Sequence, residues 1–274
     1  RVRITAQLIQ AASDKHLWAE RYDRDLKDVL ILQSEVARNI AEQIKVRLTS
    51  QEQTLLARQS AVDPEAHDLY LQARYKALRG GEQDYKDCIQ DLEKAVAKDP
   101  KYALAYAGIS WCYAALSTNY WPPREAMPNS KAAALKAMSL DDNLAEAHVA
   151  LANVLITYEW DWAGAEREAK RALELAPSLA EAHDIYSWYL MSLGRRDEAI
   201  REAKRARELD PLSLEILWDS QWMLFMAGEY DQSIEAGRMV ISKDNDICFS
   251  HALLGLTYAQ KGDASAAIAH AHVC

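Results

Sequence analysis

The chain has 274 residues, half of them hydrophobic, and a formal net charge of −9 at pH 7. Residues 1–60 contain 10 of the 32 Lys/Arg and 8 of the 41 Asp/Glu, so the acidic excess lies in the remainder of the chain. A long acidic region disfavours nucleic acid and anionic membrane as partners. No apolar run approaches the roughly 20 residues that span a bilayer.

The first 50 residues have the pattern of a β-hairpin followed by a helix. Residues 2–9 alternate apolar and polar side chains, as a half-buried strand does, and residues 17–22 form a second strand-like run after a polar turn. From about Leu26 the apolar period becomes helical and continues to Leu48. One hairpin and one helix are too little for an independent sheet domain, so we expect residues 1–50 to be the last part of a larger α/β unit.

The segments RVRITAQL at residues 1–8 and HLWAERYDR at residues 16–24 resemble the closing hairpin of a TolB-like amino-terminal domain. In bacterial proteins that segment often leads into tetratricopeptide repeats. The resemblance implies that residues 1–50 are a truncated TolB-like remnant. Residues 51–63 are mostly polar and unpatterned and are expected to be a connector.

Turn residues recur at a nearly fixed distance from residue 64 onward. Gly194, Gly228 and Gly262 are 34 residues apart. Helix-stopping residues recur at intervals of 36, 42, 35, 34 and 34, at Pro64, Pro100, Asp142, Pro177, Pro211 and Asn245. The long interval accommodates an insertion at residues 120–128. A period of this length predicts a stacked array of helical hairpins.

Each unit is expected to contain two helices, such as residues 179–193 and 197–209. Gly194 suits a left-handed cap of the first helix, and Asp197 is predicted to cap the second by accepting a backbone N–H. Small residues on the second helix allow close packing: Ala199, Ala203 and Ala206. The pattern resembles the tetratricopeptide repeat. The resemblance implies a mainly α fold, a right-handed superhelical solenoid of about six repeats over residues 64–274, with the last repeat incomplete.

No motif for catalysis or cofactor binding stands out. The chain lacks both G-x-x-x-x-G-K-[ST] and G-x-G-x-x-G, so we expect neither an enzyme nor a cofactor. A hydrolase site around Ser110 remains an alternative, although no strand precedes this serine as a nucleophile elbow requires. The four cysteines, Cys88, Cys112, Cys248 and Cys274, form no C-x-x-C pair. The first three are expected to be free and buried in helices, in the reducing environment of the cytoplasm.

Histidines occupy matching positions in several repeats, at His67, His148, His183 and His251. Equivalent positions are spread along a solenoid, so we expect these side chains to pack at helix starts and not to bind one metal. The last three replace the bulky residue that the repeat family has there. At the chain's end, H-x-H-x-C could bind zinc weakly or be a frayed tail. Trp160 and Trp162 are expected to plug a turn between helices, with ligand contact as the alternative.

By the resemblance, the first helix of each repeat lines a concave groove. Helical spacing then predicts an aromatic and apolar groove with an acidic entrance. The candidate partner-binding residues are Trp111, Glu146, Asn153, Glu181, Asp184, Trp188, Glu215, Trp218, Trp222 and Phe225. The groove lacks the Lys/Asn set with which this family clamps acidic carboxyl-terminal peptides. The expected partner is a peptide or helix with apolar and basic residues.

The sequence thus predicts a protein–protein interaction scaffold. By resemblance, it would be the regulatory portion of a larger bacterial signalling protein, such as a nucleotide cyclase or a winged-helix regulator. Three alternatives stay open. Residues 26–48 could fill the groove, a second copy could cover it in a homo-oligomer, or the chain could be a self-assembling module.

Overall fold

The structure, a computed structural model, describes residues 2–10, 15–24, 35–37, 39–42, 62–243 and 248–273. Strands β1 (Val2–Gln10) and β2 (Lys15–Arg24) pair antiparallel, with one irregularity between Leu8 and Ile9. Both agree with the predicted hairpin. In a described helical piece, Asn39 donates to the Tyr22 hydroxyl at 2.8 Å. The rest of the helix expected at residues 26–48, and most of the connector, lies outside the described residues.

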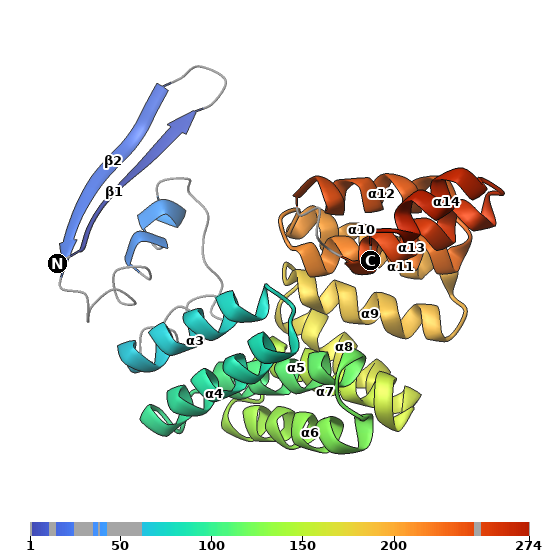
Figure 1. Ribbon diagram of the computed structural model, residues 1–274. Coiled ribbons are helices and arrows are strands. Elements are labelled where there is room, and N and C mark those ends of the chain that lie inside the picture. Colours follow the sequence, from blue (N-terminus) through green and yellow to red (C-terminus); the bar gives the residue numbers. More distant parts are fainter. Residues whose placement is uncertain are drawn as a thin grey trace.

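From residue 62 onward the described chain is an array of helical hairpins, so the predicted mainly α solenoid is confirmed (Figure 1). Helices that follow one another in the chain pack together, and the first helices of successive repeats also touch. The helices are α3 (Pro64–Ala77), α4 (Glu82–Lys98), α5 (Ala103–Asn119), α6 (Pro123–Leu140), α7 (Ala145–Val154), α8 (Trp162–Leu175), α9 (Ala180–Ser192), α10 (Arg196–Leu209), α11 (Leu214–Ala227), α12 (Tyr230–Lys243), α13 (Cys248–Gln260) and α14 (Ala264–Ala271). A π-helical turn, η2 (Leu155–Glu159), extends α7.

Small residues set the distance between helices. Ala165, Ala169 and Ala172 on α8 and, 34 positions later, Ala199, Ala203 and Ala206 on α10 are all buried. The apolar residues form a series of clusters along the array and not one central core. This is the arrangement expected when each repeat buries its surface against its neighbours.

The turns follow the predicted period with one exception. Gly194, Gly228 and Gly262 have left-handed backbones, with φ of 74°, 85° and 79°. Trp160 stands 34 residues before Gly194 and adopts the same conformation, with φ of 55°. Its side chain is 69% exposed, so the prediction that this ring plugs the turn is wrong. Asp161 instead caps α8 by accepting from the Gly164 N–H at 3.0 Å.

Two predicted details of the helix starts differ in the structure. Helix α10 begins at Arg196 with Arg195 at the cap position, and Asp197 lies within the first turn, so the predicted Asp197 cap is wrong. A carboxylate in the first turn is still favourable there because it faces the positive end of the helix dipole. The segment read as an insertion forms the start of α6, where Pro123 occupies the first helical position.

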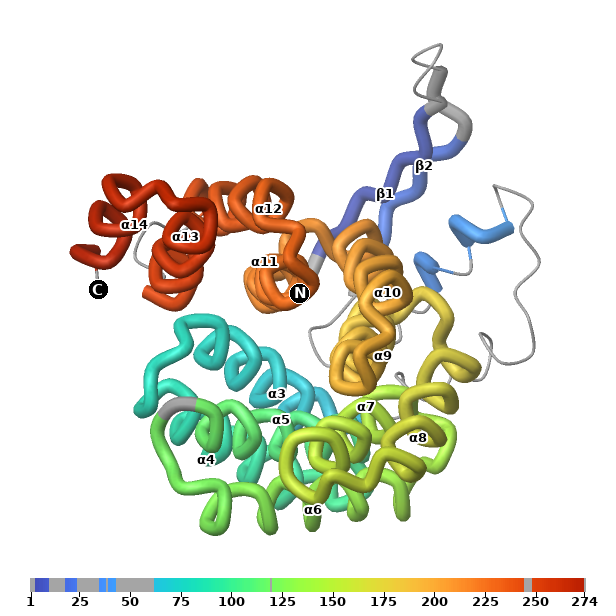
Figure 2. Tube along the Cα trace, turned by 90° about the vertical axis from the view of Figure 1, so that its right-hand side faces the viewer, coloured from blue at the N-terminus to red at the C-terminus, as the bar shows by residue number. Residues whose placement is uncertain are grey.

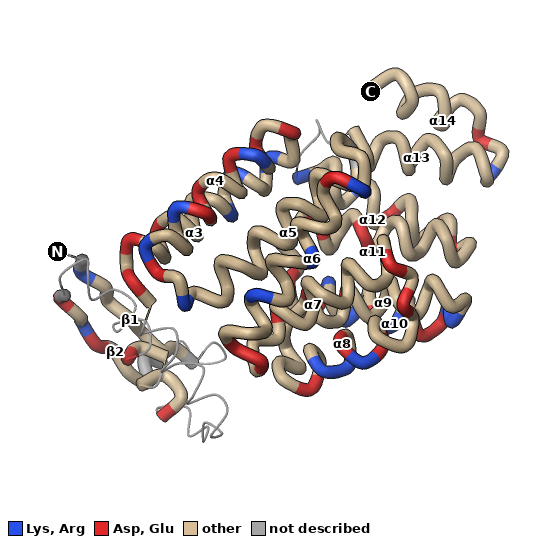
Figure 3. Tube along the Cα trace, turned by 90° about the horizontal axis from the view of Figure 1, so that it is seen from below, with Lys and Arg blue, Asp and Glu red and all other residues tan. Residues whose placement is uncertain are grey.

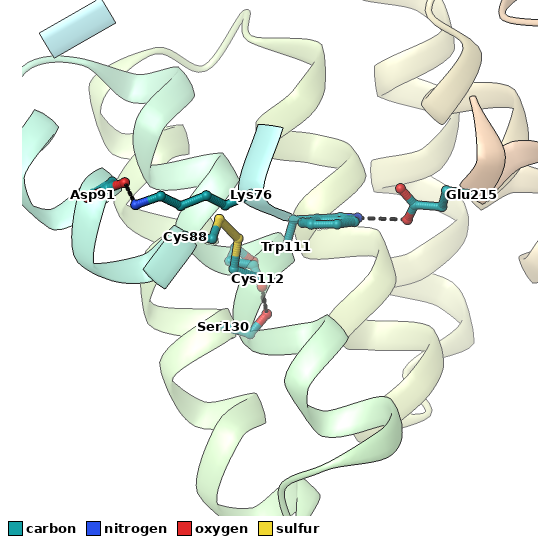
Figure 4. Close-up of a disulfide and its surroundings, with 8 residues drawn as sticks. Lys76, Cys88, Asp91, Trp111, Cys112, Ser130 and Glu215 are labelled. Carbon is teal, nitrogen blue, oxygen red and sulfur yellow. Dashed lines mark hydrogen bonds and ion pairs between the residues drawn. A yellow bond between two sulfur atoms is a disulfide. The ribbon is translucent and has the colours of Figure 1, made fainter. Parts of the chain in front are cut away.

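The prediction of free cysteines is also wrong. Cys88 on α4 and Cys112 on α5 form a disulfide between the first and second repeats, and each is only 1% exposed (Figure 4). Cys248 is disulfide-bonded as well. The packing of α4 on α5 brings two sequence-distant cysteines together, with Cα atoms 6.6 Å apart.

The array curves strongly. Figure 2 shows α3 and α5 facing α11 across the bend. Within the described residues, none of the helices combines the length and the apolar character that crossing a membrane requires.

Candidate partner-binding face

The ten candidate residues lie on α5, α7, α9 and α11, the first helices of four successive repeats. None of the ten is fully buried, whereas Ile216 and Leu217 on the same helix as Trp218 are. We use the name inner face for these ten residues together with Arg74, Asp219 and Phe249, which contact them or lie beside them.

Side chains of the inner face meet across the curve of the array. Trp111 Nε1 on α5 donates to Glu215 Oε1 on α11 at 2.8 Å, although the two residues are 104 apart in the chain (Figure 4). Arg74 Nη2 on α3 lies 3.8 Å from Glu181 Oε1 on α9. Repeats 1 and 2 therefore contact repeats 4 and 5, which the sequence did not predict.

Aromatic rings form a continuous row over α11 and α13. Trp218 and Trp222 stack with centroids 6.0 Å apart, and Phe249 meets Trp218 edge-on at 6.1 Å. Phe225 extends the row at 6.1 Å from Trp222. Phe249 is 44% exposed, so the row has an accessible end. Rings of this kind are frequent anchors in protein interfaces.

We call α5, α7, α9, α11 and α13 the inner helices, and their charged side chains all have the same sign. Helices α5, α7, α9, α11 and α13 contain no Lys or Arg, and their carboxylates are Glu146, Glu181, Asp184, Glu215 and Asp219. Basic residues gather elsewhere, for example on α4 and α8 (Figure 3). Helix α3 supplies Arg74 to the inner face, while its Lys76 pairs with Asp91 on α4. The inner face therefore has more carboxylates than cations.

The pKa values of several carboxyl groups on the inner face are raised, mainly by burial. Burial raises the pKa of Glu146. The protein atoms around Glu215 raise its pKa too, although this residue is exposed and Trp111 and Arg74 act in the opposite direction. Burial, followed by the charge of Asp219, raises the pKa of Asp184 well above its usual value. Burial and the charge of Glu215 raise the pKa of Asp219 to about 7. Such shifts indicate carboxylates with too few cationic neighbours.

Asp219 was not among the predicted residues. Asp184 and Asp219 act on each other's pKa, and Trp188 lowers the pKa of Asp219. A signal for Asp219 was present in the sequence, because α11 has no basic residue to pair with it. Asn153 contributes no hydrogen bond from its side chain to the contacts described above.

Two of the repeated histidines, His148 and His183, link the two helices of a repeat. His148 Nδ1 lies 2.8 Å from Glu168 and its Nε2 lies 2.9 Å from the Asp142 carbonyl. His183 makes the same two contacts with Glu202 and the Pro177 carbonyl. These contacts support the packing interpretation and explain why histidine replaces a bulky apolar residue. No group of three or more metal-ligating side chains occurs among the described residues, which exclude the terminal Cys274.

Ser110 is buried and not arranged as a nucleophile. Its Oγ lies 3.0 Å from Ser130 Oγ, and Ser130 also donates to the Ser110 carbonyl. In the described parts of the chain, neither a histidine nor a carboxylate hydrogen-bonds to Ser110. The structure gives no support to a hydrolase site here, because nothing would take the hydroxyl proton.

No protein-family model matches the chain. A curated protein of Rhizobium meliloti (strain 1021), named "Putative adenylate cyclase 3", is 34% identical over 159 residues. The match covers 57% of this chain and 27% of that protein, so the chain spans little more than a quarter of the relative's length.

Several solved structures share the fold at low identity. Human IFIT1, solved as a dimer with m7Gppp-AAAA, is 17% identical with a TM-score of 0.63, over 88% of this chain and 54% of that one. TTC0263, a thermophilic tetratricopeptide protein of Thermus thermophilus, is 13% identical with a TM-score of 0.57, over 71% and 99%. The type IV pilus biogenesis factor PilW is 19% identical with a TM-score of 0.53, over 75% and 90%. The chain therefore has the tetratricopeptide-like solenoid fold.

Proposed function

We propose that the chain is a protein-interaction scaffold whose inner face binds a peptide or helix with apolar and basic side chains. The observation that carries this proposal is the composition of the inner helices, which combine an accessible aromatic row with five carboxylates and no Lys or Arg. Apolar side chains of a ligand would cover the rings, and basic ones would balance the carboxylates.

The internal contacts already show this chemistry on a small scale. Arg74 places a guanidinium near Glu181 at 3.8 Å, a distance longer than a hydrogen bond, and its side chain is half-exposed. Trp111 likewise uses its indole N–H on Glu215. A basic ligand would compete with Arg74 for carboxylates that the chain itself pairs only loosely.

The same charge argues against a nucleic-acid ligand. The IFIT1 structure of similar fold contains m7Gppp-AAAA, whose phosphates are anionic. On the inner face of this chain such phosphates would meet five carboxylates and only one arginine, so repulsion would oppose binding.

The setting that we propose is a larger bacterial signalling protein. The similarity to "Putative adenylate cyclase 3" supports a cyclase over a winged-helix regulator. The repeat array would then recruit or sense a protein partner for an effector domain. The TolB-like nature of the first 50 residues stays a prediction within this proposal.

Selection from a displayed library of random peptides tests the function directly. We expect enriched peptides to combine apolar and basic residues, and a Trp222→Ala variant to bind them at least about tenfold more weakly, because it removes the centre of the aromatic row. Trp162→Ala is the matched control, since Trp162 is an exposed tryptophan outside the inner face. Helical circular dichroism establishes that each variant is folded. Enriched peptides that bind Trp222→Ala as well as the parent would refute the proposal.

A further inference from the structure

A carboxyl pair lies on the inner face between the fourth and fifth repeats. Asp184 on α9 and Asp219 on α11 lie on two helices that pack together and act on each other's pKa, and Asp219 is only 7% exposed. Asp184 Oδ1 and the neighbouring Trp218 Nε1 are the two side-chain polar atoms that are buried without a hydrogen-bond partner among the described residues. Buried polar atoms are rarely left in this state, so each needs an explanation.

Among the described residues, the largest charge effects on the pair come from acidic groups. The charged groups that act on Asp184 from α9 and α11 are Glu181, Glu215 and Asp219, all acidic. Asp219 is affected by Glu215 and Asp184 and by the neutral indole of Trp188. Arg74 on α3 acts on Glu146 and Glu215, but it is not among the largest effects on the pair. Two neighbouring carboxyl groups with so little access to water are stabilised when they hold a proton or when a cation lies with them.

Resting on the proposed function, we infer that the Asp184–Asp219 pair, with the Trp188 indole beside it, is the subsite for an arginine side chain of the peptide ligand. A guanidinium has five N–H donors in one plane, enough for both carboxylates and for the orphaned Asp184 Oδ1. It is also weakly hydrated and stacks on indole rings, whereas an ammonium group is strongly hydrated. A divalent metal is a poorer occupant, because the described residues contain no cluster of three ligands.

Binding exchanges a proton for the guanidinium. Near neutral pH the free pair holds a proton, because the pKa of Asp219 is raised to about 7 and that of Asp184 is raised too. When the guanidinium enters, the carboxyl O–H bond breaks and the proton passes to the buffer, while guanidinium N–H groups donate to both carboxylates. Arginine affinity should therefore fall as the pH drops from 8 to 6, since protons then compete with the ligand.

Three synthetic peptide pools test the subsite. They share random apolar positions and differ in one fixed central residue, which is arginine, lysine or citrulline, the neutral shape analogue of arginine. We expect the arginine pool to bind at least about tenfold more tightly than either of the other two. In Asp184→Asn/Asp219→Asn this preference should shrink to within about twofold, while Asp197→Asn, an exposed carboxylate on α10, should keep it.

Two further measurements separate effects on peptide binding from effects on folding: the number of protons released on binding, and the melting temperature. Calorimetry of an arginine peptide near pH 7, in two buffers of different ionisation enthalpy, should show proton release with the parent chain and none with the double variant. The double variant should melt higher than the parent at pH 8 and not at pH 4. The raised carboxyl pKa values favour the folded state only below the folded pKa, and that stability is lost as the pH rises through about 7.

Each outcome decides between the two proposals. Equal binding of the arginine and citrulline pools, or an arginine preference that survives the double variant, overturns the subsite while the scaffold function stands. Equal binding of lysine and arginine overturns the choice of guanidinium. If no pool binds to the folded parent chain, both the subsite and the proposed function fail.

Discussion

His148 and His183 hold the same position in successive repeats and make the same two contacts, but they differ in burial. The His148–Glu168 pair is almost fully buried, whereas the His183 and Glu202 side chains are 14% and 29% exposed. Removing His148 would leave a buried carboxylate with only Arg167 as a partner. A buried charge that loses a partner is costly, while an accessible one recovers hydration.

We therefore expect His148→Ala to lower the free energy of unfolding by about 2–3 kcal/mol and His183→Ala by about 1 kcal/mol. Urea denaturation followed by circular dichroism measures both. Equal losses in the two variants would mean that these histidines act only by filling space, and that the carboxylate contacts add nothing.

Single residues were predicted well where a repeat position fixes their surroundings, and poorly where distant repeats decide them. The candidate residues on α9 and α11 lie on helices that the period predicted, and their role in binding a partner stays a prediction. The contact between Trp111 and Glu215 and the approach of Arg74 to Glu181 depend on how far the whole array curves. No local pattern contains that information. Asp219 was missed because it lies one residue away from the repeat position that matches Asp184.

At the scale of elements, the repeat period correctly predicted where the helices end, but it did not predict every capping residue. Three glycines take the left-handed turn as expected, because a residue without Cβ adopts it at little cost. Trp160 occupies the equivalent position in the third repeat with the same backbone conformation, next to the π-helical turn. A side chain in this region adds a steric energy that glycine avoids.

We expect Trp160→Gly to stabilise the chain by about 1 kcal/mol, because relief of backbone strain exceeds the added freedom of the unfolded chain. The Trp160 ring is mostly exposed, so little packing is lost. Trp160→Ala is the matched control, since it removes the ring and keeps the strain. A higher melting temperature for Ala as well as Gly would assign the effect to the ring and not to the backbone.

The disulfide between α4 and α5 illustrates what element prediction leaves out. Both cysteines fall within predicted helices, where they were expected to be buried whether or not the two touch. Cys88 and Cys112 are 24 residues apart in the chain, and only the packing of one repeat on the next brings them together.

Closing a loop of this length is expected to stabilise the first two repeats by about 3 kcal/mol, mainly by restricting the unfolded chain. Reduction should therefore lower the melting temperature of the parent, and should affect Cys88→Ala/Cys112→Ala much less. A parent chain that melts at the same temperature with and without reductant, after its thiols are shown to be free, would contradict this expectation.

At the scale of the molecule, curvature is the sum of small rotations between successive repeats, and a fixed period does not determine its amount. The contact between Trp111 and Glu215 is the described hydrogen bond that spans the greatest chain distance, and it joins the second repeat to the fifth. We therefore expect it to limit how far apart the two arms of the inner face can move. If this hydrogen bond holds the two arms of the array together, removing its donor should open the array without unfolding any repeat.

Trp111→Phe removes the indole N–H and keeps an aromatic ring, so we expect the radius of gyration from small-angle X-ray scattering to rise while helix content is unchanged. Trp121→Phe is the matched control, because Trp121 Nε1 also donates to a glutamate, Glu82, at 3.1 Å, but between adjacent repeats. Opening in the first variant alone would place the curvature under the control of one long-range contact. The same opening in both variants, or in neither, would show that packing between neighbouring repeats sets the curvature.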